Sequence, residues 1–217
     1  MGFSFNLNVV TLNCCSLKKN IDLIRQLASD SFDIIFLQET FVIDEKLGIL
    51  DYIDENFESI GVPAVYSDKN LMAGVGRPEG GLAILWRRGA SFRIHNVVLE
   101  NNFIVLDILV SGLHVILVNV YLNSDTWEVC TLERYLQSLS CLEDILRDYN
   151  YDSIFFVGDF NADPLSGRAW RSLSRFMSEN SLVCYDVLSL PADSHTFIGY
   201  GNSSCRWLDH IGGKILL

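Results

Sequence analysis

Short apolar runs, each long enough for one β-strand, recur along almost the whole chain and constrain its fold more than any other feature. They are rich in Val, Ile and Phe and are bounded by Gly, Asn, Asp or Ser, which is typical of strands. Several are continuously apolar, which predicts strands covered on both faces. A break at Ser111-Gly112 predicts a hairpin. The runs are residues 6–12, 33–38, 81–86, 102–110, 114–121 and 153–158.

Three segments between these runs have the spacing of amphipathic helices. In residues 127–147 leucine recurs every three or four positions, and Ser124-Asp125 offers an N-cap. Residues 17–29 and 167–180 repeat the pattern more briefly. No Pro- or Gly-rich linker divides the chain, so we expect one α/β domain in which sheets pack together and helices lie outside.

Charge and composition bound the classes of partner. The net charge is −11, from 16 Lys+Arg against 27 Asp+Glu, which argues against binding nucleic acid by bulk electrostatics. A nuclease remains allowed, because it needs clustered carboxylates for a metal and only a local basic patch. No run reaches the roughly 18 residues that cross a membrane, and no signal peptide is evident. We therefore expect an intracellular protein whose six cysteines are reduced and mostly fill the core.

The segment "FFVGDFNADP" at residues 155–164 places polar groups directly after a buried strand. An acid in the position of Asp159 is costly to bury unless it meets a metal or a hydrogen-bond partner. Because side chains alternate across a strand, Asp159 and Asn161 are expected to point one way and Phe160 the other. That spacing suits a carboxylate and an amide that share one phosphoryl group.

Other strand ends offer similar groups, although each has a simpler alternative. A strand-end Asn or Asp is more often a turn former, Glu39 more often an acid at a helix start, and Tyr121 more often a core or edge aromatic. The order of the motifs favours the functional interpretation. The groups are Asn13, Gln38, Glu39, Thr40, Asn119, Tyr121, Asn123, Thr196 and Asp209.

The ordered motifs resemble the endonuclease/exonuclease/phosphatase family. "LNCCSL", "FLQET", "GGLAIL", "VNVYLN", "VGDFNADP", "TF" and "WLDHI" are similar to its successive motifs and extend over nearly the whole chain. "GDFNADP…GRAWRSL" and "LPADSHTFIGYGNSSCRWLDHI" most resemble the apurinic-like endonuclease domain of non-LTR retrotransposons. The resemblance implies a four-layer α/β sandwich, two packed mixed β-sheets flanked by helices, that cleaves phosphodiesters with Mg²⁺ or Mn²⁺.

The resemblance also implies roles for the matching residues. Glu39 is the implied principal metal ligand, assisted by Asn13, and a hard divalent cation does prefer such oxygen ligands. Asp159 is implied to orient or deprotonate the attacking water, and Asn161 to bind the scissile phosphate. Tyr121 is implied to contact the phosphate or leaving group, and Thr196 to lie on the substrate path. Asp209 is implied to orient a catalytic histidine.

One expected motif, Ser-Asp-His downstream of Asp209, does not occur in the sequence. We therefore expect residues 1–217 to be a C-terminally truncated domain with reduced or lost nicking activity. His210 directly follows Asp209 and is expected to face the opposite side of a strand. His195 precedes Thr196 and could lie near the site, although a surface loop histidine is the commoner interpretation.

Arg168, Arg171 and Arg175 recur at helical spacing and form a candidate DNA-binding stripe, although a solvated helix face is the commoner interpretation. The leading hypothesis is a Mg²⁺-dependent DNA endonuclease, nuclear if it acts for a retroelement, with a reverse transcriptase encoded downstream as a candidate partner. The alternatives are a non-catalytic DNA- or protein-binding remnant of the same fold, and a phosphatase of phospholipids or nucleotides.

Overall fold

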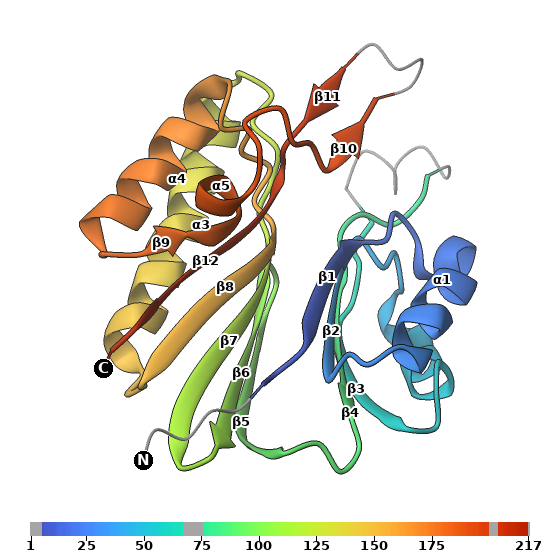
Figure 1. Cartoon of the computed structure of the whole chain (residues 1–217). Coiled ribbons are helices and arrows are strands. Elements are labelled where there is room, and N and C mark those ends of the chain that lie inside the picture. The colour runs from blue at the N-terminus through green and yellow to red at the C-terminus, as the bar shows by residue number, and fades with distance from the viewer. Residues whose placement is uncertain (1–5, 67–75, 200–203, 217) are drawn as a thin grey trace.

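The apolar runs form the central strands of two sheets that face each other in a computed structural model, which describes residues 6–66, 76–199 and 204–216 (Figure 1). The four-stranded sheet has the order β1-β2-β4-β3, in which β1 and β2 are parallel and the other pairs are antiparallel. Its strands are β1 (Val9–Asn13), β2 (Ile34–Gln38), β3 (Phe57–Val62) and β4 (Leu82–Arg87).

The six-stranded sheet has the order β5-β6-β7-β8-β12-β9, in which only β7 and β8 are parallel. The predicted hairpin joins β6 to β7, and Ser111 and Gly112 at its turn have φ of 51° and 85°, as a two-residue hairpin turn of this twist requires. The strands are β5 (Phe92–Glu100), β6 (Phe103–Val110), β7 (Leu113–Tyr121), β8 (Ser153–Asp159), β9 (Val183–Cys184) and β12 (Asp209–Ile215). A separate pair is formed by β10 (Phe197–Ile198) and β11 (Cys205–Arg206).

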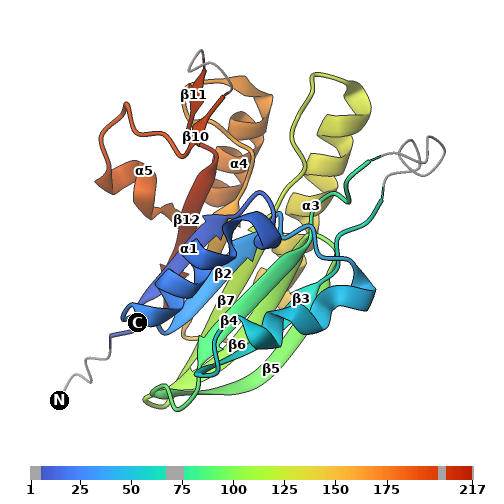
Figure 2. The ribbon, with the colours of Figure 1, turned by 90° about the vertical axis from the view of Figure 1, so that its right-hand side faces the viewer.

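Helices cover the outer face of each sheet, so the chain forms the four layers that the motifs imply. Figure 2 shows the four-stranded sheet from the side of α1. The outer face of this sheet is covered by α1 (Leu17–Ser29) and the 3₁₀-helix η1 (Asp44–Tyr52). The outer face of the six-stranded sheet is covered by α3 (Val129–Asp148) and α4 (Gly167–Glu179), with the short α5 (Tyr185–Ser189) beside β12.

The core has three parts, one between each pair of layers. Ile34, Phe36 and Ile84 of one sheet pack between the sheets against Leu106 and Leu117 of the other. The opposite faces of the same strands pack against the helices. This double burial explains why the strand runs are continuously apolar instead of alternating.

Several expectations from the sequence need correction. Glu128 is the N-cap of α3, because the Asp125 carboxylate binds Arg168 instead. Strands β3 and β5 lie outside the predicted apolar runs, because polar and partly exposed residues interrupt their apolar pattern. Cys14 is buried and the partly buried Cys141 and Cys184 pack against the core, but the other three cysteines are exposed, so core filling holds for only half of the six. Within the described residues, no helix is long and apolar enough to span a membrane.

Candidate active site

The carboxyl ends of β1, β2, β7 and β8 meet at the same edge of the two facing sheets (Figure 1). The amino end of β12 joins them, because Asp209 pairs with Asp159 in the antiparallel register, while Tyr121 pairs with Asp159 on the other side. Asn13 ends β1 and Glu39 directly follows β2. Sheet topology therefore brings together five of the residues singled out from the sequence.

Two hydrogen bonds connect the sheets at this edge. The Asn13 side-chain amide donates to Asp159 Oδ2 at 2.8 Å, and the Tyr121 hydroxyl donates to Glu39 Oε1 at 3.2 Å. Each bond joins a residue of one sheet to a residue of the other. The oxygen-bearing side chains thus surround one small volume between the sheets.

A buried polar bridge lies directly beneath this volume. Gln38 and Asn119 are fully buried, and Gln38 Nε2 donates to Asn119 Oδ1 at 2.6 Å. The Asn119 amide in turn donates to the carbonyl oxygens of Leu37 and Ala83, at 3.1 and 2.9 Å. These bonds satisfy polar groups that would otherwise be costly to bury, so the bridge holds the two sheets at one spacing below the site.

Left-handed backbone positions the residues at the strand ends. Glu39 has φ of 52° and Asn161 has φ of 48°, conformations that cost energy for a residue with a Cβ and that cluster at functional sites. The Asn161 amide nitrogen donates to Asp159 Oδ1 at 2.8 Å, and its side-chain amide donates to the Leu122 carbonyl oxygen at 2.8 Å. Because β8 ends at Asp159, this turn and not strand alternation places Asn161. Phe160 packs into the helix-side core.

Two glycines allow the close approach that the site needs. A Cβ added to Gly158, at φ of 132°, would collide with the Val120 carbonyl oxygen and lie 3.0 Å from Gln38 Nε2. A Cβ added to Gly81 would lie 2.5 Å from Thr40 Oγ1. These contacts give a physical reason for glycine in "VGDFN" and in "GGLAIL".

Thr196 holds the start of β12 beside the site. Its hydroxyl oxygen accepts hydrogen bonds from the backbone amides of Leu208 and Asp209, at 3.0 and 3.1 Å. Asn13, Thr196 and Asp209 help to line a pocket of about 290 Å³. Among the described residues, the buried Asp209 Oδ1 has no hydrogen-bond partner, so it is an oxygen that still requires a donor or a cation.

The electrostatics of the site favour the binding of positive charge. Burial raises the pKa of Asp159, the nearby Asp209 carboxylate raises it further, and hydrogen bonds from Asn161 and Asn13 offset part of the effect. Burial also raises the pKa of Asp209. A cation among these carboxylates would relieve their repulsion and desolvation. The side chains of Asn13, Glu39, Asp159 and Asp209 offer carboxylate and amide oxygens as ligands, a set that suits a hard divalent cation such as Mg²⁺.

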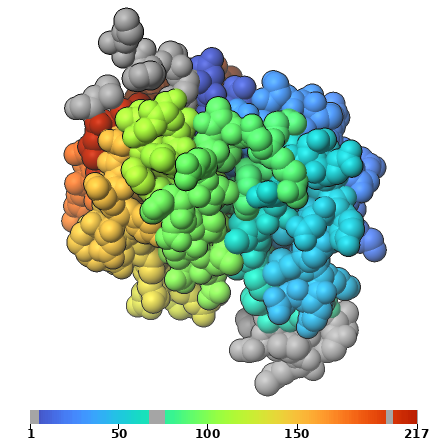
Figure 3. All heavy atoms as spheres, turned by 90° about the horizontal axis from the view of Figure 1, so that it is seen from below, coloured from blue at the N-terminus to red at the C-terminus, as the bar shows by residue number. Residues whose placement is uncertain are grey.

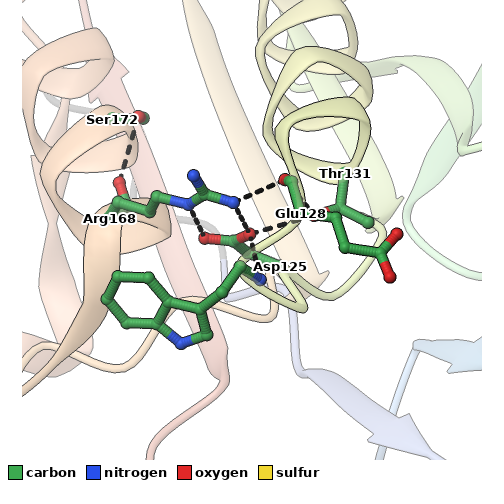
Figure 4. A network of polar contacts seen from close by, with 6 residues as sticks. Asp125, Glu128, Thr131, Arg168 and Ser172 are labelled. Carbon is green, nitrogen blue, oxygen red and sulfur yellow. Dashed lines mark hydrogen bonds and ion pairs between the residues drawn. The ribbon is translucent and has the colours of Figure 1, made fainter.

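The arginine stripe lies on α4, where two of its members are engaged within the chain. Arg168 binds the Asp125 carboxylate through two hydrogen bonds of 2.6 and 2.7 Å and donates to the Glu128 carbonyl oxygen at 2.6 Å (Figure 4). Arg175 pairs with Glu179 at 2.8 Å. Arg171 is exposed and makes no ion pair with the described residues. Of the three, only Arg171 therefore presents an uncompensated charge.

The two histidines near the site motifs are placed as the sequence indicated. His195 is exposed. His210 faces away from Asp209 and is buried, with Nδ1 2.8 Å from Asp186 Oδ2 and Nε2 2.6 Å from the Ala162 carbonyl oxygen. Neither ring nitrogen of His210 is thus left for chemistry at the site.

Two residues near Glu39 were missed by the sequence patterns. The Arg77 guanidinium lies 4.6 Å from the centroid of the Phe41 ring, and its charge acts on Cys15. The Cys15 thiol donates to Glu39 Oε2 at 3.6 Å. Burial and, to a smaller extent, the charge of Glu39 raise the pKa of this thiol. Arg77 lies outside every apolar run and helical pattern, so no periodicity could have indicated it.

The fold and site define the class of the protein: a four-layer α/β sandwich with an oxygen-rich, cation-compatible site where its two sheets end. The sequence profile of the Endonuclease/Exonuclease/phosphatase family matches residues 4–211, and the chain belongs to this family. Members of the family are metal-dependent hydrolases that act on phosphodiester bonds.

Solved structures with the same fold include two AP endonucleases and a 3′ phosphatase. An AP endonuclease from Leishmania major has a TM-score of 0.72 at 13% identity and covers 95% of this chain and 78% of its own. An AP endonuclease from Archaeoglobus fulgidus has 0.70 at 17%, covering 96% and 86%. The Neisseria 3′ phosphatase NExo, bound to a product DNA hairpin, has 0.69 at 17%, covering 96% and 86%. At these identities the likeness shows the fold alone. No curated protein matches the sequence.

Proposed function

We propose that this chain is a divalent-metal-dependent phosphodiesterase that nicks DNA as an endonuclease. The observation that carries the proposal is the convergence of Asn13, Glu39 and Asp159 beside the unpartnered, buried Asp209 Oδ1, in a member of a family of phosphodiester hydrolases. Fold neighbours that are AP endonucleases, and one that holds a DNA product, support DNA as the substrate class.

The residues present fit a Mg²⁺ or Mn²⁺ ion. Glu39 would be its principal ligand and Asn13 would assist, because both offer oxygen atoms at the ends of neighbouring strands. When bound, such a cation stabilises the negative charge that develops on a phosphate during hydrolysis. The buried Asp209 Oδ1 beside these ligands has no hydrogen-bond partner among the described residues, so positive charge or a donor is missing there.

The chain's own groups supply proton transfer and orientation. Asp159 accepts the proton of the attacking water, and hydrogen bonds from Asn13 and Asn161 fix the direction of its carboxylate. Asn161 uses one N–H of its side chain on the Leu122 carbonyl oxygen and has a second for a phosphate oxygen. Burial raises the pKa of Tyr121, so its hydroxyl stays protonated. Its single proton, which bonds Glu39 Oε1 in this structure, would turn to the phosphate or leaving group when substrate binds.

The finer parts of the proposal concern context and rate. The order of the sequence motifs supports a retrotransposon-type endonuclease that works in the nucleus with a reverse transcriptase partner. We also infer reduced activity in residues 1–217, because Asp209 Oδ1 accepts no hydrogen bond from the described residues. A segment carrying Ser-Asp-His, appended to the chain, should supply an imidazole donor there and raise the rate.

A plasmid-nicking assay with Mg²⁺ or Mn²⁺ tests the proposal, on the chain with and without the Ser-Asp-His segment. We expect Glu39→Gln and Asp159→Asn each to lower nicking by about 100-fold or more. Glu45→Gln, an exposed acid on η1, is the matched control and should nick normally. Nicking in both site variants at the control rate would overturn the proposal.

The same samples distinguish the alternatives. A binding remnant would retain DNA in EDTA, and with Asp159→Asn, while never nicking. A phosphatase would release inorganic phosphate from phospholipids, nucleotides or 3′-phosphorylated DNA without cutting a plasmid. The Neisseria neighbour, which is a 3′ phosphatase, makes the last substrate worth including.

A further inference from the structure

Two histidines and an aspartate gather on the six-stranded sheet, far from the candidate active site. His95 lies on β5, Asp107 on β6 and His114 on β7. His114 precedes Tyr121 by seven positions on the same strand, so the backbones of these two residues lie about 23 Å apart. Figure 3 shows this opposite end of the molecule, with the green residues of β5 and its neighbours at its surface.

A β-bulge turns His95 toward the aspartate. The pairing of β5 with β6 shifts between Ile94 and Asn96, so His95 is an extra residue beside Asn96, which pairs with Asp107. A bulge of this kind re-aims a side chain. His114 reaches the same carboxylate diagonally from β7, where it pairs with Leu109. Three adjacent strands therefore direct ligand atoms to one place.

The distances are close to those of a tetrahedral metal site. His95 Nδ1 lies 3.0 Å from Asp107 Oδ2, and His114 Nδ1 lies 3.4 Å from Asp107 Oδ1. The ligand atoms of all three residues lie within 4.8 Å of one another. Metal–ligand bonds of about 2.0–2.2 Å place tetrahedral ligands about 3.3–3.6 Å apart, so small side-chain movements suffice to coordinate an ion.

The site is open enough to admit an ion and deep enough to hold one. The Asp107 side chain is 9% exposed, whereas those of His95 and His114 are 63% and 40% exposed. The second ring nitrogen of each histidine makes no hydrogen bond with the described residues. The similar group Cys184, Asp186 and His210 does not compete, because both nitrogens of its histidine are already bonded inside the core.

We propose that His95, Asp107 and His114 form a second metal site, specific for a borderline transition ion such as Zn²⁺. Two imidazoles and one carboxylate suit Zn²⁺, whereas Mg²⁺ prefers oxygen ligands throughout. β5 is the edge strand of its sheet, so an ion bound to β5, β6 and β7 together ties this edge to the interior. The site does not depend on the proposed nuclease activity.

Equilibrium dialysis with Zn²⁺ tests the site on the whole chain, in excess Mg²⁺ to occupy the oxygen-rich site. We expect one tightly bound Zn²⁺ per chain, a rise in the unfolding temperature on Zn²⁺ addition, and at least about 100-fold weaker binding in His95→Ala. His95 is exposed on an edge strand, so the variant should fold. His195→Ala, an exposed loop histidine, should bind Zn²⁺ like the wild type.

Zinc-edge X-ray absorption on the wild-type chain gives a readout that needs no variant. Two imidazole nitrogens with oxygen ligands are expected. A sulfur shell would assign the ion to exposed cysteines such as Cys15 or Cys130, and an oxygen-only shell would assign it to the candidate active site. Either shell, or equal binding in wild type and His95→Ala, would overturn the proposal.

Discussion

At the scale of single residues, buried polar side chains decide how closely the two sheets meet. Gln38 and Asn119 have no exposed surface, and each satisfies the other across the interface. An apolar pair would fill the same space without specifying one spacing. The polar pair thereby fixes the distance between Glu39, next to Gln38, and Tyr121, two positions beyond Asn119.

The bridge gives a stability prediction. Gln38→Leu removes the donor to Asn119 Oδ1 and leaves a buried acceptor unsatisfied, which costs about 1–3 kcal/mol. Urea denaturation should show this loss in the free energy of unfolding. Gln26→Leu, an exposed position on α1, should change it by less than about 0.5 kcal/mol. An equal effect in both variants would contradict a special role for the bridge.

At the scale of elements, the start of α4 is tied to the segment before α3 by the Arg168 network (Figure 4). Hydrogen bonds from the Arg168 guanidinium lower the pKa of the Asp125 carboxyl. The Arg168 guanidinium also lies 5.5 Å from the centroid of the Trp127 ring. Arg168 therefore has a structural role, which the helical spacing of the arginines did not indicate.

Experiments should therefore distinguish the structural role of Arg168 from a DNA-binding role of Arg171. We expect Arg168→Ala to lower the unfolding temperature, because it disconnects the start of α4 from the segment before α3. Arg171→Ala should leave that temperature unchanged, weaken DNA binding for all sequences alike, and reduce the salt slope of log K by about 1. Thermal melts and binding isotherms at several salt concentrations measure both effects. Unchanged DNA affinity in Arg171→Ala would leave α4 as an ordinary solvated helix.

The junction of β12 with α5 predicts a pH dependence. Burial alone would raise the pKa of Asp186, but hydrogen bonds from His210 and from the Ile211 amide outweigh it and lower that pKa below its ordinary 3.8. A carboxyl with a lowered pKa stabilises the folded state fully above 3.8, and this stabilisation is lost as the pH falls through the folded-state value. Acid should therefore loosen β12 and with it Asp209.

Urea unfolding of wild type and Asp186→Asn across this pH range checks the effect. The wild type should be more stable by a constant amount above about pH 5, and the difference should shrink below pH 4. Asp193→Asn, an exposed acid, should show no such gap. A gap that grows as the pH falls would have the wrong sign for this explanation.

At the scale of the whole molecule, the candidate active site concentrates negative charge where the two sheets end. Burial raises the pKa of Asp159 most, and the charges of Asp209 and Glu39 raise it further, because neighbouring carboxylates repel one another. The metal-free chain is therefore strained electrostatically at the point where its sheets and β12 join. Stability and cation binding should be coupled through that point.

This coupling predicts stabilisation by Mg²⁺. At a concentration of 100 times the dissociation constant, Mg²⁺ should add about 2.7 kcal/mol to the free energy of unfolding. Calorimetry should show the unfolding temperature of the wild type rising with Mg²⁺ and that of Glu39→Gln remaining nearly constant. Glu45→Gln should respond like the wild type. An equal rise in the Glu39→Gln variant would place the cation elsewhere.

The sequence by itself determined the local elements and the identity of the polar groups at their ends. Apolar runs located β2, β4, β6, β7 and β8, because strands buried on both faces need continuous apolar residues. The order of the motifs indicated the family. Partly exposed strands such as β5 could not be located in this way, because their polar residues remove the signal.

Only the tertiary structure decided which of these groups meet. The pairing of Asp209 with Asp159, the bridge from Gln38 to Asn119 and the bond from Arg168 to Asp125 join residues that are dozens of positions apart. Local propensity carries no information about such partners, because each contact depends on how sheets and helices pack. The chain thus specifies its polar groups locally, while the four-layer packing converts them into a site.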